Sequence, residues 1–358
     1  MNPLNLVVIG TGALGKHHAR ILSTLPGVRL AAIAELNEAA GRDLADKYGA
    51  RWVADYREVL GEVDAAVVAV PTQAHWAVSR DLLLRRIPLL VEKPLAADLN
   101  QARQLVSLAR QNETLLQVGH VERFNAAFVE GRRHIGSPKY IRGERFSPFA
   151  FRSTDIGVVH DMMIHDIDLV LSLVKSDLVG VEAFGVQLLG HNEDCVQARL
   201  RFKNGCIADL SANRVSPVQK RHMQVWSCTG CTDIDFGSRE VAHYAPTDLL
   251  RFGQCPVDRA RQPGVSIDSL KKEVFESYIH VDKLEVPASD ALTAELTEFV
   301  ECLRSDKRPQ VAGEEALAAL TVADRVLASV AQHQWSGDST GPVGQVLLRE
   351  SDRLRKAA

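Results

Sequence analysis

The stretch Leu6-Val7-Val8-Ile9-Gly10-Thr11-Gly12-Ala13-Leu14-Gly15 decides the fold of the first part of the chain. Its apolar residues are typical of a buried parallel strand, and residues 16–25 have the pattern of a helix. Gly10 permits a tight turn, Gly12 lets the backbone approach a pyrophosphate, and Gly15 lets the helix pack closely on the strand. We therefore expect a dinucleotide at this turn, with its phosphates at the helix N-terminus.

An acidic residue stands where a dinucleotide site needs one. A second strand pattern at 28–34 ends before Glu35, twenty residues after Gly15. A carboxylate there should hydrogen-bond the adenosine ribose hydroxyls and repel a 2′-phosphate. No Arg follows Glu35 directly, so we expect NAD rather than NADP as cofactor. The alternative is a solvated helix-capping residue, but strand, glycines, helix, second strand and acid together favour the dinucleotide.

Strand and helix patterns continue to alternate up to about residue 119. Predicted strands at 65–70, 88–91 and 115–118 are separated by predicted helices at 76–86 and 99–111. This alternation predicts a doubly wound parallel sheet, an α/β Rossmann domain over residues 1–119. Ligands of such sheets bind at the carboxyl ends of the strands. The residues expected to line the cofactor there are Pro71, Thr72, His75, Glu92, Lys93 and His120.

A row of polar residues stands in an otherwise apolar helix pattern over residues 160–174. Asp161, His165 and Asp168 are spaced at i, i+4 and i+7, which puts them on one helix face. Unpaired buried charges are costly, so the row should pair internally, bind a ligand or line a cleft. A structural Asp-His pair and a metal site are the other interpretations.

The second half of the chain has a different pattern. Strand-like runs follow one another without a long helix, at 179–189, 195–202, 206–213, 222–227, 232–236 and 278–286. They predict an α+β domain over residues 120–358, with a large open, mostly antiparallel sheet covered on one face by the helix 160–174. Residues 244–269 have weak periodicity and are predicted to be a long loop. Amphipathic helices are predicted at 291–304 and 314–334.

Composition limits the class of protein. Of the 358 residues 46% are hydrophobic and 24% charged, with a formal net charge of −3, as in an ordinary globular protein. These values give no reason to expect a nucleic-acid or membrane partner. The absence of a secretory signal pattern and the sparse cysteines favour a reduced cytoplasmic protein. Cys228-Thr229-Gly230-Cys231 lacks a second ligand pair, so we interpret it as a tight turn between strands and expect no metal.

Four motifs together resemble the glucose-fructose oxidoreductase / inositol dehydrogenase / MocA (Gfo/Idh/MocA) family. They are the Gly10–Gly15 turn, Pro71-Thr72-Gln73-Ala74-His75, Glu92-Lys93-Pro94 and Asp161-Met162-Met163-Ile164-His165-Asp166-Ile167-Asp168. The resemblance covers essentially the whole chain. It implies an NAD-dependent dehydrogenase acting on CH-OH groups, with Lys93, Asp161 and His165 as the catalytic group. Met163 departs from the family, which often has Gly there.

The implied reaction is hydride transfer from a secondary carbinol carbon to nicotinamide. The imidazole of an unperturbed histidine has a pKa near neutrality, so His165 suits a general base. Lys93 could stabilise the developing alkoxide or itself act as the base, and the sequence leaves the two alternatives open. Asp161 should orient His165 or contact the substrate. A ligand-sensing protein without catalysis is the alternative from another class, but both Lys93 and His165 are present.

Within the family, residues 119–125 and 162–168 look most like the UDP-N-acetylglucosamine 3-dehydrogenase branch. That branch oxidises a sugar 3-hydroxyl ahead of a transaminase, for example in lipid A biosynthesis. Arginine recognises phosphate through its bidentate fork, so we expect Arg123, Arg145 and Arg152, with Asn125, to contact a UDP-sugar together with Lys93, Asp161 and His165. A surface ion pair is the alternative for each Arg, and we expect it for at least one of the three. An inositol or a free sugar is the alternative substrate. The open sheet should expose apolar side chains, which predicts a homodimer or homotetramer.

Overall fold

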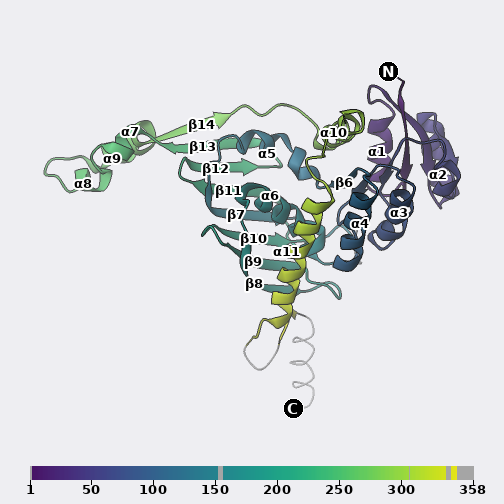
Figure 1. Ribbon diagram of the computed structural model, residues 1–358. Coiled ribbons are helices and arrows are strands. Elements are labelled where there is room, and N and C mark those ends of the chain that lie inside the picture. The colour runs from purple at the N-terminus through teal and green to yellow at the C-terminus, as the bar shows by residue number, and fades with distance from the viewer. Residues whose placement is uncertain (1, 152–155, 306, 336–339, 345–358) are drawn as a thin grey trace, which may run out of the picture. The chain divides into compact units, whose positions relative to one another are not determined.

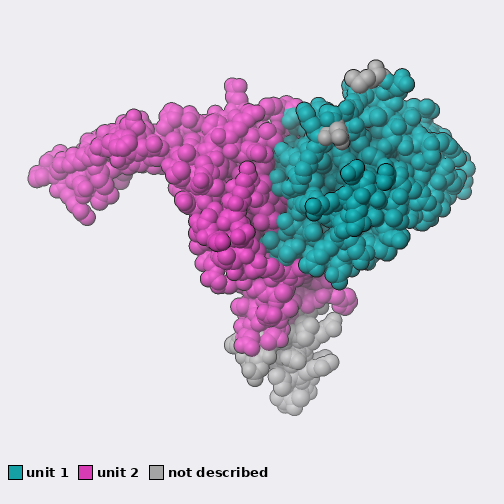
Figure 2. Space-filling model, in the orientation of Figure 1, with its two compact units in different colours: residues 1–124, 289–322 teal, residues 125–288, 323–358 magenta. Residues whose placement is uncertain are grey.

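The structure is a computed structural model that describes residues 2–151, 156–305, 307–335 and 340–344. The chain forms two compact units (Figures 1 and 2), residues 1–124 with 289–322, and residues 125–288 with 323–358. The first unit therefore includes a late stretch of chain that the sequence patterns place after the second sheet. None of the helices in the described ranges combines the length and apolar character that crossing a bilayer requires.

A parallel sheet of six strands forms the centre of the first unit, in the order β3-β2-β1-β4-β5-β6. This is the order of a doubly wound dinucleotide-binding sheet, so the predicted Rossmann fold is confirmed. The short apolar runs form strands because both sheet faces are covered by helices. The strands are β1 (Leu4–Ile9), β2 (Val28–Ala34), β3 (Arg51–Val53), β4 (Ala65–Val68), β5 (Leu89–Glu92) and β6 (Leu116–Gly119).

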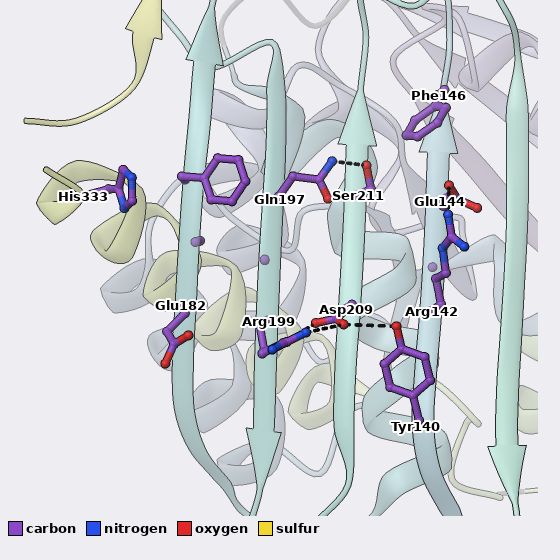
Figure 3. A pocket seen from close by; sticks show the side chains of 14 residues that line it. Tyr140, Arg142, Glu144, Phe146, Glu182, Gln197, Arg199, Asp209, Ser211 and His333 are labelled. Carbon is purple, nitrogen blue, oxygen red and sulfur yellow. Dashed lines mark hydrogen bonds and ion pairs between the residues drawn. The ribbon is translucent and has the colours of Figure 1, made fainter. Parts of the chain in front are cut away.

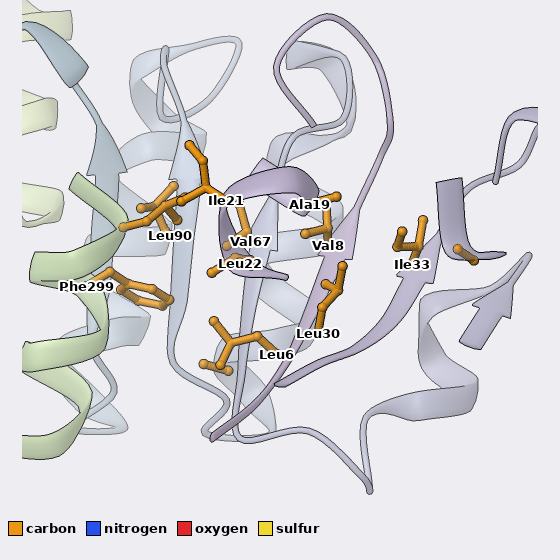
Figure 4. Packing of buried hydrophobic residues seen from close by; sticks show 13 residues of the cluster. Leu6, Val8, Ala19, Ile21, Leu22, Leu30, Ile33, Val67, Leu90 and Phe299 are labelled. Carbon is orange, nitrogen blue, oxygen red and sulfur yellow. The ribbon is translucent and has the colours of Figure 1, made fainter. Parts of the chain in front are cut away.

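Helices from both ends of the sequence complete the first unit. They are α1 (Gly15–Leu22), α2 (Glu38–Tyr48), α3 (Thr72–Leu84), α4 (Leu99–Gln111), α10 (Ala291–Ser305) and the first half of α11 (Gly313–Gln332), with 3₁₀ turns at Tyr56–Val59 and Val121–Phe124. Phe299 of α10 joins the buried cluster that contains Ile21 and Leu22 of α1 and Leu90 of β5 (Figure 4). α10 therefore supplies part of the core of the dinucleotide-binding sheet.

The second unit is built on a mixed sheet of nine strands, in the order β14-β13-β12-β11-β7-β10-β9-β8-β15. Among the described strands of this second sheet, only the pairs β7–β10 and β8–β15 are parallel, so the predicted large, mostly antiparallel sheet is confirmed. The strands are β7 (Pro138–Phe146), β8 (Leu178–Gln187), β9 (Cys195–Phe202), β10 (Ile207–Asn213), β11 (Lys220–Ser227), β12 (Gly230–Asp235), β13 (Glu240–Pro246), β14 (Ile279–Leu284) and β15 (Val343–Gly344).

Helices cover one face of this sheet. α6 (Ile164–Val174) packs on β7 and β10 (Figure 1). Ser329 in the second half of α11 accepts the backbone N–H of Ala183 in β8 at 2.8 Å. α5 (Ala126–Gly131) packs on β12 and β13. In β9 the alternate residues Val196, Ala198, Leu200 and Phe202 are buried on this face. The polar residues between them lie on the opposite face, as the period of a strand requires.

Two parts of the second unit differ from the sequence prediction. β7 and β13 were not predicted. In β7 the alternation of apolar and polar residues is interrupted by the charged residues of Lys139-Tyr140-Ile141-Arg142-Gly143-Glu144-Arg145. The prediction of a loop over 244–269 is wrong, since β13 is followed by α7 (Asp248–Phe252), α8 (Pro256–Ala260) and α9 (Ile267–Glu273), and a π-turn at Val274–Tyr278 leads into β14. These helices form an arm beyond the end of the sheet (Figure 1). Helices of one or two turns are too short to show helical periodicity.

Candidate functional site

The glycine turn has the geometry that a dinucleotide requires. Gly10 has φ +91°, and a Cβ on it would lie 2.7 Å from the carbonyl oxygen of Ala69. A Cβ on Gly15 would overlap the carbonyl oxygen of Gly10, so α1 can begin this close to β1 only with glycine. No atom lies within 4 Å of a Cβ built on Gly12, so the turn is open where a phosphate would approach. The residues present therefore fit the cofactor.

Glu35 closes the same turn from the end of β2. Its Oε2 accepts hydrogen bonds from the backbone N–H of Thr11 at 2.8 Å and from its hydroxyl at 2.7 Å, and Oε1 accepts the N–H of Asn37 at 2.9 Å. Partial burial acts to raise the pKa of Glu35, but these hydrogen bonds outweigh it and hold the pKa below its ordinary value. Glu35 is thus ionised at neutral pH, which fits the predicted repulsion of a 2′-phosphate. Leu36 beside it is 89% exposed.

The predicted residues after β4 divide into exposed and buried ones. Pro71 precedes the first turn of α3, which begins at Thr72, so both lie at a helix N-terminus. His75 is buried, and its ring nitrogens lie 2.8 Å from the carbonyl oxygen of Pro94 and 2.9 Å from that of Val70. Burial lowers the pKa of His75. His75 thus joins two strand-end loops, and its contact with the cofactor stays a prediction.

Lys93 follows β5 and is half-buried, and the peptide bond to Pro94 is cis. Glu92, the last residue of β5, is buried, and its Oε1 lies 2.6 Å from Nε2 of His18 in α1. Gly119 at the end of β6 permits this arrangement, since a Cβ there would lie 2.9 Å from Oε2 of Glu92. The loop that carries Lys93 is thereby tied to the helix that follows the glycine turn.

The predicted residues at 120–125 are mostly buried. His120 and Arg123 lie in the 3₁₀ turn region after β6, with exposed fractions of 1% and 6%. The carbonyl oxygen of Arg123 accepts a hydrogen bond from Nε2 of Gln310 at 3.5 Å. The side chain of Asn125 caps α5 by accepting the N–H of Ala127 at 3.0 Å. Their roles toward a substrate stay predictions.

The predicted helix 160–174 has two parts. Residues Val159–Met163 form a π-turn, with Asp161 in it, and α6 begins at Ile164, directly before His165. The simple i, i+4 spacing therefore does not describe Asp161 and His165, because a π-turn has i→i+5 hydrogen bonds. Both side chains are half-buried, whereas Asp168 is 1% exposed. π-turns within helices frequently occur at functional sites.

Arg145 of β7 lies in a buried ion pair. Its Nε and Nη2 contact Asp166 of α6 at 3.1 and 2.7 Å, and the side chains are 5% and 3% exposed. This pair joins α6 to the sheet one residue after His165. A substrate contact for Arg145 stays a prediction, and Arg152 lies outside the described residues.

The uncovered face of the nine-stranded sheet carries a hollow of about 770 Å³. Arg199, Asp209 and Tyr140 form one hydrogen-bonded set in it, and Gln197 and Ser211 form another (Figure 3). This face exposes the apolar side chains of Phe184 and Trp226, as expected, together with charged and polar residues along β9, β10 and β7, so its character is mixed. None of the predicted site residues that the structure describes lines this hollow.

Sequence reasoning missed three buried titratable residues near these elements. Among the described residues, no group of three His, Cys, Asp or Glu side chains is arranged to hold a metal ion. His18 pairs with Glu92, Glu193 contacts the π-turn, and Glu295 in α10 is fully buried. The positions of His18 and Glu295 could have indicated their burial, because each lies three residues from an apolar residue on the buried face of its helix. Glu193 lies between strands, where no periodicity exists.

The glycine turn, the strand order and the carboxylate at β2 define the class of protein, an oxidoreductase with an NAD-binding Rossmann domain. Residues 4–120 match the profile described as "Oxidoreductase family, NAD-binding Rossmann fold", and residues 117–230 match the GFO/IDH/MocA C-terminal domain. The chain belongs to the Gfo/Idh/MocA family, and its cofactor is NAD.

Similar proteins include two kinds of dehydrogenase. UDP-N-acetylglucosamine 3-dehydrogenase of Acidithiobacillus ferrooxidans is 30% identical over 87% of this chain and 93% of that protein. Its solved structure aligns with a TM-score of 0.80 at 28% identity, over 92% of this chain and 98% of that one. The scyllo-inositol 2-dehydrogenase (NAD(+)) of Bacillus subtilis is 25% identical over 88% of this chain and 90% of that protein.

Proposed function

We propose that this chain oxidises UDP-N-acetylglucosamine at C3 to the 3-keto sugar nucleotide. The observation that carries the proposal is the likeness to the 3-dehydrogenase of A. ferrooxidans, which spans both units at 30% identity. A 3-keto sugar nucleotide is a suitable substrate for a transaminase. We therefore place the reaction before such a step, as in lipid A biosynthesis, in the cytoplasm.

Each residue has a separate role in the proposed chemistry. Bound NAD supplies the hydride-accepting carbon. The N-terminal end of α1 and the N–H groups of the glycine turn bind the pyrophosphate, and Glu35 binds the adenosine ribose. Lys93 donates a hydrogen bond to the reacting hydroxyl oxygen and stabilises its developing negative charge. His165 accepts the hydroxyl proton, and Asp161 orients the imidazole or the sugar. Arg123 and Asn125 are proposed to contact the nucleotide.

Oxidation of an inositol is the second candidate function. It is supported by the similarity to the B. subtilis scyllo-inositol 2-dehydrogenase over 90% of that protein. The two substrates share a ring with secondary hydroxyls, and only the sugar nucleotide carries phosphates.

We also propose that the enzyme is a homodimer or homotetramer, as is common for soluble proteins of this size.

One assay separates the two candidates. Purified protein with NAD should form NADH with UDP-N-acetylglucosamine and little or none with myo-inositol, scyllo-inositol or free N-acetylglucosamine. The equilibrium can oppose ketone accumulation, so a carbonyl trap such as hydroxylamine, or a transaminase, is added to every reaction. Turnover of an inositol, with no response to UDP-N-acetylglucosamine when the ketone is trapped, would replace the first function by the second.

A further inference from the structure

The chain enters the π-turn of Asp161 through residues 156–159, and side chains from a distant segment hold this entry. Oε1 of Glu193 accepts the backbone N–H of Val159 at 3.1 Å, and the Glu193 carbonyl oxygen accepts that of Val158 at 3.0 Å. Nη1 of Arg214 donates to the carbonyl oxygen of Ile156 at 2.7 Å. Three of the four positions in the entry segment, Ile156, Val158 and Val159, are thus fixed by these hydrogen bonds.

The residues that hold the entry are themselves fixed. Arg214, after β10, donates from Nε to Oδ1 of Asp194 at 2.8 Å. The other Asp194 oxygen accepts the N–H groups of Leu188 and Leu189 at 2.7 and 2.8 Å. Glu193, Asp194 and Arg214 are 8%, 0% and 6% exposed. Buried charges with satisfied hydrogen bonds rigidify their surroundings, so these three residues form a stiff support. We call them the Glu193 clamp.

Gly157 fits against the clamp because it has no side chain. A Cβ built on it would overlap both carboxylate oxygens of Glu193. The carbonyl oxygen of Gly157 accepts the backbone N–H of Asp161 at 3.0 Å. Displacement of Gly157 by a larger residue would therefore move the backbone of Asp161 directly. His165 follows one turn later on the same continuous helix.

We propose that Glu193 is a positioning residue of the active site, which sets where the π-turn begins and thereby the orientation of Asp161 and His165. The proposal rests on the proposed role of these two residues in oxidising a hydroxyl group. A side chain with an acceptor oxygen suits the place, because the first N–H groups of a helix have no partner within the helix. Burial raises the pKa of Glu193, against the smaller effects of its hydrogen bond to Val159 and of the nearby His160 and Arg214, and His160 lies 3.1 Å from Asp324 of α11.

The test is a double-mutant cycle between Gly157→Ala and Glu193→Ala. Gly157→Ala should lower kcat by ~10- to ~100-fold, the scale of a misplaced catalytic group. Its effect on the Kd of NADH, measured by fluorescence, should be less than about 2-fold, because the NAD-binding residues are in the other unit. In a Glu193→Ala background the same Gly157→Ala change should cost less than ~3-fold, since the clash is gone. Glu193→Gln keeps an acceptor oxygen and should retain most of the kcat.

Gly190→Ala and Glu182→Ala are the matched controls, because a Cβ on Gly190 meets no atom within 4 Å and Glu182 is exposed. Circular dichroism checks that each variant is folded. Strictly additive effects of Gly157→Ala and Glu193→Ala, or an unchanged kcat in folded Gly157→Ala, would overturn the proposal. If Gly157→Ala does not fold, the comparison of Glu193→Gln with Glu193→Ala decides. Equal kcat values for these two variants would contradict the proposal.

Failure of the proposed function can be separated from failure of this inference. If the wild type oxidises neither UDP-N-acetylglucosamine nor an inositol, the proposed function fails. The imidazole signals of His165 are then followed by NMR in histidine-labelled protein, with His165→Gln to assign them. Gly157→Ala should change the chemical shifts and the titration midpoint of His165, and Gly190→Ala should not. An unmoved His165 signal in Gly157→Ala would contradict the inference without any substrate.

Discussion

Lys93 and His165 are the side chains on which the proposed chemistry depends most. We expect Lys93→Ala and His165→Ala each to lower kcat at least ~100-fold while NADH still binds, as is usual for an oxyanion-stabilising or acid-base group. Lys203→Ala and His191→Ala, both on exposed residues, are the controls. Stopped-flow hydride transfer and NADH fluorescence measure the two effects. Near-normal turnover in either variant would remove that residue from the mechanism.

Glu35 should determine the choice between NAD and NADP. Leu36 is 89% exposed beside it, so Leu36→Arg would place a cation where a 2′-phosphate must lie. We expect Glu35→Ser/Leu36→Arg to raise the ratio of kcat/KM for NADP to that for NAD by at least ~10-fold, about 1.4 kcal/mol. Glu38→Ser, on an exposed residue of α2, is the control. Equal kcat/KM values for NAD and NADP in the unmodified protein would contradict the assignment of Glu35.

Glu295 should make the stability of the first unit depend on pH. Burial, together with the charges of Glu92 and Glu298, raises its pKa well above the ordinary value. Its contribution to stability is therefore present below the unfolded pKa and is lost as pH rises through the folded one. The side chain in Glu295→Gln cannot ionise, so the variant does not lose stability in this way as the pH rises. The difference in Tm between the variant and the wild type should become more positive from pH 5 to pH 8.5, whereas exposed Glu301→Gln should change little.

Residue types at strand ends could be predicted from the sequence, but their partners could not. Lys93 after β5 and Glu35 after β2 follow from the pattern of a parallel sheet. The pairing of Glu92 with His18, and of Arg145 with Asp166, joins segments far apart in the sequence. Spacing within one helix or strand carries no information on such pairs, so Asp166 could not be predicted as the partner of Arg145.

At the scale of elements, the Arg145–Asp166 pair attaches α6 to the sheet. Removing one partner of a buried ion pair costs about 3–5 kcal/mol, because the other charge stays buried. We expect Asp166→Ala to lower the free energy of unfolding by about this amount in urea titrations. Asp209→Ala in the pair with the half-exposed Arg199 should cost no more than ~1 kcal/mol. A similar small cost for both variants would show that burial does not strengthen the first pair.

Elements with a strong period were predictable and short or polar ones were not. The bounds of β2, α4 and β9 agree with the residues predicted from periodicity, and Lys203-Asn204-Gly205 is the turn between β9 and β10. The π-turn could not be predicted, since its insertion depends on Glu193 and Gly157 rather than on local pattern. The charged alternation of β7 is explained by the ion pairs on the uncovered sheet face.

At the scale of the whole molecule, the arm of residues 247–278 is a closed excursion. Pro246 pairs with Ile279, and the N–H of Thr247 donates to the carbonyl oxygen of Tyr278 at 3.0 Å, so its two ends meet. Replacement of 247–278 by Asn-Gly should give a β13–β14 hairpin. We expect the shortened protein to fold with the NADH affinity of the intact one. A loss of NADH binding or of cooperative unfolding would show that the arm supports the fold.

The return of residues 289–322 to the first unit bears on how the protein is made. Leu296 and Phe299 belong to the core that also contains β1, α1 and β5. A ribosome has therefore produced the strands β7 to β14 of the second sheet before the first unit can close its own core. Until then the apolar surface of Ile21, Leu22 and Leu90 lacks its cover. Such a chain is exposed to aggregation during translation, so its yield in a cell should depend on chaperones that bind nascent apolar segments.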